Sequence, residues 1–192
     1  MIKRIIITAA LSAASVLSVA QTVNYNDQYN RLVARVGAAG VGVETLIGKW
    51  EKADSADVNM LKAKFAYYFT KSRTEEVMVK PSKTYLGMQP VITLKDSLGA
   101  PVNYFQVPVF DEELFSQALK SIDKAIQLHP EDLSLYFNKT ATLLDYEGES
   151  PDLTLACLNS LIDKWNNNSL NWVYPEAGKV DDDFFLEAVQ AY

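Results

Sequence analysis

The chain has 192 residues, of which 48% are hydrophobic and 22% charged, with a formal net charge of −6. This composition is typical of a globular protein and excludes collagen-like, low-complexity and wholly disordered chains. The acidic balance argues against a nucleic-acid-binding face. A single cysteine and a single histidine exclude an internal disulfide and leave little material for a metal centre built on those residues.

The first twenty residues have the pattern of a cleaved secretory signal peptide. Lys3 and Arg4 give a basic start, and an uncharged, largely apolar stretch runs from there to Ala20. A membrane anchor is the alternative, but the stretch is shorter than the ~20 residues that a spanning helix needs. We therefore predict cleavage after Ala20, export to the periplasm or beyond, and a mature domain over residues 21–192 without a membrane span.

The mature chain begins with apolar residues at helical spacing. Tyr29–Val36 and Val43–Trp50 predict two helices separated by glycines. Met60–Phe69 predicts a third, aromatic-rich helix that is buried on more than one side. Asp57 is expected to cap this third helix, because its carboxylate can accept hydrogen bonds from the free N–H groups of the first turn.

Residues 73–110 change to β-forming residues and prolines. Val91–Lys95 and Val102–Gln106 are short extended segments joined by the turn sequence Asp96-Ser97-Leu98-Gly99. They predict a β-hairpin, so that this region is a small β insertion in an otherwise helical chain.

Helical spacing resumes after the insertion. The expected helices are 111–129, Leu133–Leu144, Leu153–Trp165 and a last one that Asp181-Asp182-Asp183 opens. The first of these ends before Pro130, because the residue that precedes a proline avoids helical geometry. Ser150 is expected to cap the helix at Leu153, with Pro151 at its first position.

An internal repeat connects these helices. Three segments share a core: Leu46-Ile47-Gly48-Lys49-Trp50, Ser121-Ile122-Asp123-Lys124-Ala125 and Leu161-Ile162-Asp163-Lys164-Trp165. Such self-similarity is typical of arrays of paired helices. The clearest pattern is Ala118, Ile122, Ala125 and Pro130, in which small residues allow close helix approach, the large residue fills the groove and proline ends the helix.

This pattern resembles the second half of a tetratricopeptide (TPR) repeat, and residues 117–144 resemble a TPR helix-turn-helix throughout. The resemblance implies a mainly α fold, a TPR-like solenoid of helical hairpins, with the β-hairpin inserted over residues 73–110. It also implies a concave groove lined by the first helix of each pair, here 57–69 and 133–144. More broadly, the chain looks like exported bacterial TPR-containing proteins.

Two surfaces are candidates for binding. Lys62, Lys64, Asn138 and Lys139 are expected to be exposed in the groove, which would then be locally basic and suit an acidic segment of a protein or peptide partner. Trp172 and Tyr174, in the loop 166–180, are candidates for a second surface that binds a glycan or small ligand together with the insertion. Trp50 and Trp165 occupy core positions of the repeat and are expected to be buried.

No motif predicts catalysis. His129 stands at a helix end, where the negative pole of the helix dipole accounts for it. Asp181-Asp182-Asp183 lacks the oxygen spacing of a calcium loop and is expected to cap a helix. No nucleophile elbow or phosphate-binding loop occurs. We therefore predict a non-catalytic protein without a metal or cofactor.

Overall fold

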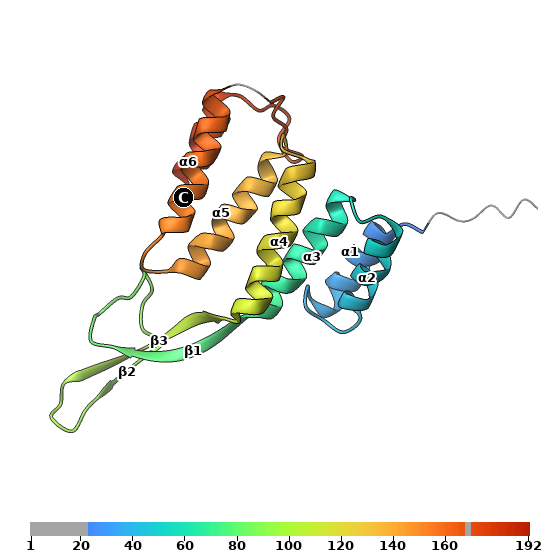
Figure 1. Cartoon of the computed structure of the whole chain (residues 1–192). Coiled ribbons are helices and arrows are strands. Elements are labelled where there is room, and N and C mark those ends of the chain that lie inside the picture. The colour runs from blue at the N-terminus through green and yellow to red at the C-terminus, as the bar shows by residue number, and fades with distance from the viewer. Residues whose placement is uncertain (1–22, 168–169) are drawn as a thin grey trace, which may run out of the picture.

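Figure 1 shows the computed structural model, which describes residues 23–167 and 170–192. The described residues form seven helices and three strands: α1 (Tyr25–Val36), α2 (Val43–Ala53), α3 (Val58–Ser72), β1 (Arg73–Lys80), β2 (Ile92–Lys95), β3 (Pro101–Phe110), α4 (Glu112–Leu128), α5 (Leu133–Glu147), α6 (Asp152–Asn166) and α7 (Asp182–Gln190). The prediction of a mainly helical fold with a small β insertion is therefore confirmed. The predicted signal peptide, Met1–Ala20, lies outside the described residues. Over the part of the chain that is described, no helix is both long and apolar enough to cross a bilayer.

Aspartate side chains cap the N-termini of most helices from α3 onward. Asp57, Asp111 and Asp181 each accept hydrogen bonds from backbone N–H groups in the first turn of α3, α4 and α7, which confirms the cap predicted at Asp57. The cap predicted at Ser150 is wrong. Pro151 holds the cap position of α6 without a side-chain acceptor. Instead, the carboxylate of Glu147 at the end of α5 accepts hydrogen bonds from the N–H groups of Leu153 and Thr154.

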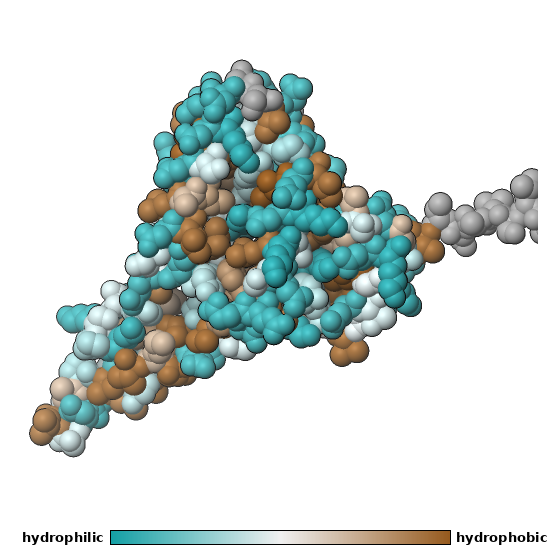
Figure 2. All heavy atoms as spheres, viewed as in Figure 1, coloured by the Kyte–Doolittle hydropathy of each residue, from teal (hydrophilic) through white to brown (hydrophobic). Residues whose placement is uncertain are grey.

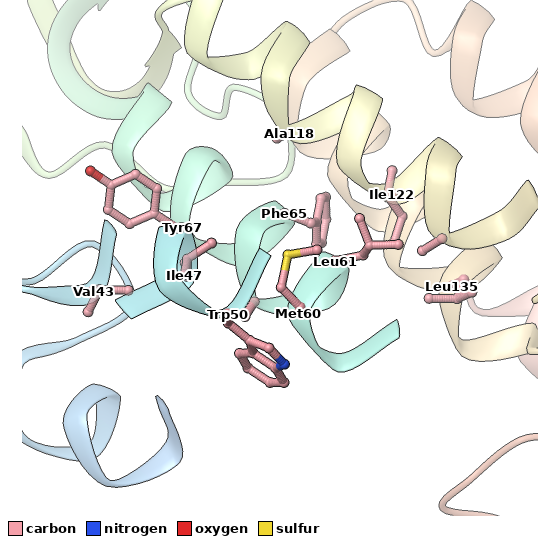
Figure 3. Packing of buried hydrophobic residues seen from close by; sticks show 12 residues of the cluster. Val43, Ile47, Trp50, Met60, Leu61, Phe65, Tyr67, Ala118, Ile122 and Leu135 are labelled. Atoms are coloured by element: carbon pink, nitrogen blue, oxygen red, sulfur yellow. The ribbon is translucent and has the colours of Figure 1, made fainter. Parts of the chain in front are cut away.

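Helices α3 to α6 lie side by side in chain order, and α3 and α4 form the central antiparallel pair (Figure 1). Ala118, Ile122 and Ala125 of α4 are fully buried, and they belong to the same cluster as Leu61 of α3. Figure 3 shows Leu61 next to Ile122. Small residues therefore let α4 approach α3 closely while isoleucine fills the space between them, as the sequence predicts.

The two ends of the helical region pack around tryptophans. Trp50 of α2 is 3% exposed and stacks with Tyr25 of α1 at 6.1 Å between ring centroids. At the other end, Trp165 of α6 stacks with Phe185 of α7 at 4.1 Å. The expected burial is confirmed for Trp50. Trp165 is only half-buried, because it packs against the outside of a second hydrophobic cluster, which α5, α6 and α7 form.

The insertion has three strands rather than the predicted two, in the antiparallel order β1-β3-β2. The predicted hairpin corresponds to β2 and β3, whereas β1 was missed because its run Val77-Met78-Val79 does not alternate between apolar and polar residues. We call residues 73–110 the finger and the seven helices the body.

The finger is a direct continuation of the central helix pair. Strand β1 begins at Arg73, the residue after α3 ends, and β3 leads into α4 through Asp111. At this junction the N–H of Asp111 donates to the carbonyl of Ser72 at 2.8 Å. An antiparallel pair of helices thus becomes an antiparallel pair of strands that projects away from the body (Figure 1).

Candidate binding site

The surface predicted from the TPR resemblance is not a free basic groove. Each of its lysines is half-buried and ion-paired: Lys62 with Asp132 at 2.9 Å, Lys64 with Glu51 at 2.7 Å and Lys139 with Asp123 at 2.7 Å. Asn138 is exposed, as expected, but the expectation that the lysines are exposed is wrong. The acids come from neighbouring helices or helix ends, which the sequence pattern alone does not bring together.

The second predicted surface, at Trp172 and Tyr174, is partly internal. The Trp172 ring lies 5.7 Å from that of Tyr136 and 5.9 Å from that of Trp165, and the Tyr174 ring lies 5.2 Å from that of Phe184. Both side chains are half-buried, and the Nε1 of Trp172 is buried without a hydrogen-bond partner. A pocket of about 510 Å³ adjoins Trp165, Trp172 and the acidic start of α7.

The residues weighed for catalysis and for calcium binding are engaged in local contacts. His129 is the cap residue at the end of α4, and its Nδ1 is 3.8 Å from a carboxylate oxygen of Glu131. Asp181 is engaged as the cap of α7, with Lys179 at 2.7 Å. Among residues 23–167 and 170–192, no three histidine, cysteine, aspartate or glutamate side chains are placed to hold a metal ion.

The structure shows a different groove, at the base of the finger. It measures about 940 Å³ and lies between β1 and β3, the loop that follows β1, the helix α5 and the end of the chain. We call it the base groove. Its lining residues are Arg73, Glu75, Leu86, Met88, Gln89, Val91, Gln106, Pro108, Ala141, Leu144, Asp145, Gly148, Ala191 and Tyr192.

One margin of the base groove is an unpaired strand edge. Strand β2 pairs with β3 only over residues 101–104, whereas β1 pairs with β3 over residues 103–110. The backbone groups of Tyr104 point toward β2, since its carbonyl accepts from the N–H of Val91. In an antiparallel strand alternate residues point their backbone groups the same way, so Gln106 and Pro108 present theirs at the edge beyond β2.

Pro108 fits this open edge. A proline has no N–H to donate and is tolerated in a sheet only where a ladder hydrogen bond is not needed. In the described structure, neither the backbone N–H and carbonyl of Gln106 nor the carbonyl of Pro108 has a hydrogen-bond partner. The edge therefore offers two carbonyl acceptors and one N–H donor to an incoming strand.

The polar side chains of the base groove are fixed by one another. Arg73 donates to Asp145 of α5 at 3.0 Å and to Glu75 at 3.1 Å, and the Gln106 amide also donates to Glu75. Partial burial disfavours the charged guanidinium, but the two carboxylates outweigh this, so that the pKa of Arg73 lies above its ordinary value. These contacts fasten the base of the finger to α5.

The outer margin of the base groove is fastened to the turn between α5 and α6. Glu149 lies 3.5 Å from Lys80, and the side chain of Leu86 approaches Gly148. A hydrogen bond from the Tyr85 hydroxyl, followed by the charge of Lys80, lowers the pKa of Glu149 below its ordinary value. The loop is therefore held near α5, and Leu86 and Leu144 remain exposed in the groove.

Comparisons with models of known protein families, with curated proteins and with solved structures give no match.

Proposed function

We propose that this protein is an exported, non-catalytic adaptor of the TPR-like helical class that binds an extended segment of a partner protein in the base groove. The TPR-like interpretation is supported by the side-by-side order of α3 to α6 and by the close α3–α4 contact at Ala118, Ile122 and Ala125. Export is supported by the signal-peptide pattern of residues 1–20.

The unpaired edge of β3 is the observation on which the binding proposal rests. Addition of a strand to an exposed sheet edge gives affinity through backbone hydrogen bonds, and pockets for alternate side chains give specificity. Here Gln106 and Pro108 supply the backbone groups, while Leu86 and Leu144 supply apolar contacts for every second side chain. The partner segment is therefore extended, with apolar residues in alternate positions and a free N–H opposite Pro108.

Binding is tested with a fluorescein-labelled octapeptide that alternates valine with lysine, measured by fluorescence anisotropy. We expect saturable binding, and we expect Gln106→Pro, which removes the donor from the edge, to weaken it at least about tenfold. A peptide of the same sequence with alternate backbone nitrogens methylated should not bind. Failure of the plain peptide to bind, or equal binding of both peptides, contradicts the proposal.

A pair of charge reversals provides the matched control. Lys64→Glu and Lys139→Glu alter the surface that the TPR resemblance predicted, and both lie away from the base groove. Binding of the octapeptide should survive them. If these variants weaken binding as much as Gln106→Pro does, the partner occupies the helical surface instead.

A glycan-binding function is the second candidate, favoured by the pocket beside Trp165 and Trp172. Aromatic faces next to carboxylate and amide side chains provide stacking and hydrogen bonds, and Asn166, Asp181 and Asp182 line this pocket. Titration of the tryptophan fluorescence with soluble polysaccharides tests it. A shift that Trp172→Phe abolishes supports glycan binding, and no change with any polysaccharide contradicts it.

A further inference from the structure

The two faces of the finger are covered to very different extents. Directly paired residues of antiparallel strands point to the same face, so the register divides the finger into two sets of side chains. We call the outer part of the first set the open face: Val77, Val79, Ile92, Leu94, Val102 and Tyr104. Glu75, Gln106 and Pro108 continue the same side of the sheet toward the base of the finger. The opposite set, the covered face, includes Met78, Lys80, Thr93, Lys95, Asn103 and Phe105.

The loop that follows β1 covers the middle of the covered face. The Asn103 amide donates to the carbonyl of Ser82 at 2.9 Å, and the Tyr85 ring lies 5.8 Å from that of Phe105. As a result, Asn103 is 6% exposed and Phe105 is fully buried. A polar side chain is therefore inside the finger, although aliphatic side chains on the other face are not.

No segment among the described residues covers the open face in a comparable way. Val77 and Val79 of β1 are 64% and 57% exposed, and Ile92 and Leu94 of β2 are each 49% exposed. Even Val102 and Tyr104, on the central strand, are only half-buried. Figure 2 shows hydrophobic residues gathered along the finger. A continuous apolar surface of this kind marks an interaction site rather than scattered surface residues.

We propose that the open face is a self-association surface, on which the fingers of two copies of this chain stack face to face. The six side chains of the open face carry no charge, so that two identical faces meet without repulsion, and each fits the other around a two-fold axis. Aliphatic sheet faces pack in this way in β-sandwiches, about 10 Å apart.

The available area suits such a pair. The exposed parts of the six side chains amount to roughly 500 Å² per copy, so that a two-fold pair that covers them completely buries about 1,000 Å², the lower limit of a specific interface. The side chain of Leu98, 92% exposed at the tip, is available to add to this area.

The position of the finger also permits the pairing. The finger projects from the body (Figure 1), so two fingers can stack while the bodies remain apart. This separation matters because each chain carries a net charge of −6, whereas the outer half of the finger carries Lys80, Lys83 and Lys95 against one acid, Asp96. The pairing thus places the least acidic part of the molecule at the contact.

The test is sedimentation velocity of the purified protein over a concentration series from about 1 to 500 μM. We expect a reversible monomer–dimer equilibrium. Ile92→Lys places a charge in the open face and should weaken the dimer at least about tenfold. Thr93→Lys is the matched control, because Thr93 is the next residue of β2 and lies on the covered face. It should leave the dissociation constant within about twofold.

Three outcomes overturn the proposal: a monomer at every concentration, an equal effect of both lysine variants, or open-ended growth beyond the dimer. Binding of monomers to anionic phospholipid vesicles, lost in Ile92→Lys, would assign the open face to a membrane surface instead. Circular dichroism of each variant checks that it is folded. Gln106 pairs with Val77 and lies on the same side of the sheet as the open face, so the two proposals are separated by the peptides rather than by Gln106→Pro. The octapeptide with methylated backbone nitrogens tests strand addition without any change to the finger.

Discussion

The helices α3 and α4 and the strands that continue them both carry large apolar side chains, but the helices bury these side chains and the strands expose them. In α3 and α4, Met60, Leu61 and Ile122 are at most 1% exposed. In β1 and β2, which continue or adjoin that pair, Val79 and Ile92 are about half exposed. Burial of apolar area stabilises a fold, so the helical half contributes more of the stability, while the finger leaves apolar surface exposed, as the proposed pairing of two copies requires.

The largest effect is expected in the helical half. Ile122→Ala removes a fully buried side chain between α3 and α4 and should lower the free energy of unfolding by about 3 kcal/mol, from lost burial and the cavity that remains. Urea denaturation measures it. A loss below about 1 kcal/mol would show that the α3–α4 contact is not the centre of stability.

A smaller effect is expected where the body buries an ion pair. Lys62→Met leaves Asp132, whose side chain is 10% exposed, with fewer partners and should cost about 1–2 kcal/mol. Lys179→Met is the control, because Lys179 is 80% exposed beside Asp181 and surface pairs contribute little. Equal urea midpoints for the two variants would contradict the importance of the buried pair.

The start of α6 gives a pH-dependent prediction. Glu147 accepts from the N–H groups of Leu153 at 2.5 Å and Thr154 at 2.8 Å. Partial burial raises its pKa, but these hydrogen bonds outweigh burial and leave the pKa below the ordinary value of 4.5. Glu147→Ala should therefore cost about 1 kcal/mol at pH 7.

The sign of the pH dependence follows from that lowered pKa. The stabilisation is complete above the ordinary value of 4.5 and is lost as the pH falls through the lower value of the folded protein. The difference in stability between Glu147→Ala and the unchanged protein should thus shrink below pH 4.5. A difference that stays constant from pH 7 to pH 3 would show that the carboxylate is not the cap.

The smallest effect is expected at the tip of the finger. Leu98 is 92% exposed, so Leu98→Ser should change the free energy of unfolding by less than about 0.5 kcal/mol. Urea denaturation should be measured at concentrations where the chain is monomeric, so that the result reports the stability of the finger and not its contact with a second copy. A larger loss would mean that the tip packs on the body.

Sequence patterns predicted the helices well, because each amphipathic segment carries its own periodicity and several carry an aspartate cap. The buried set Ala118, Ile122 and Ala125 followed from spacing alone. The contacts of Lys62, Lys64 and Lys139 could not be predicted, since their acidic partners are 13 to 70 residues away in the sequence. Ion pairing of this kind depends on how helices are placed, which periodicity does not specify.

The base groove was missed for a similar reason. Its two margins, β3 and α5, are each visible in the sequence, but they are joined by contacts between distant residues, such as the Arg73–Asp145 pair and the packing of Phe110 on Tyr146. One local signal was present in the sequence. Pro108 interrupts a run of β-forming residues, and a proline inside a strand indicates an edge where no neighbouring strand needs its N–H. Part of the open face could also have been predicted, because Ile92-Thr93-Leu94-Lys95 alternates between apolar and polar residues, which indicates a strand with one apolar face.

The absence of a loop between α3 and β1 has a mechanical consequence. Ser72 ends α3 and Arg73 begins β1, so no flexible loop separates the first helix from its strand. The second connection, from β3 to α4, is held to the first by the hydrogen bond from the Asp111 N–H to the Ser72 carbonyl. A load or twist on the strands is therefore delivered along two covalent backbones into the tightly packed contact between α3 and α4, which resists deformation. We therefore expect that a partner bound at the far end of the finger would load the hydrophobic contact between α3 and α4 directly.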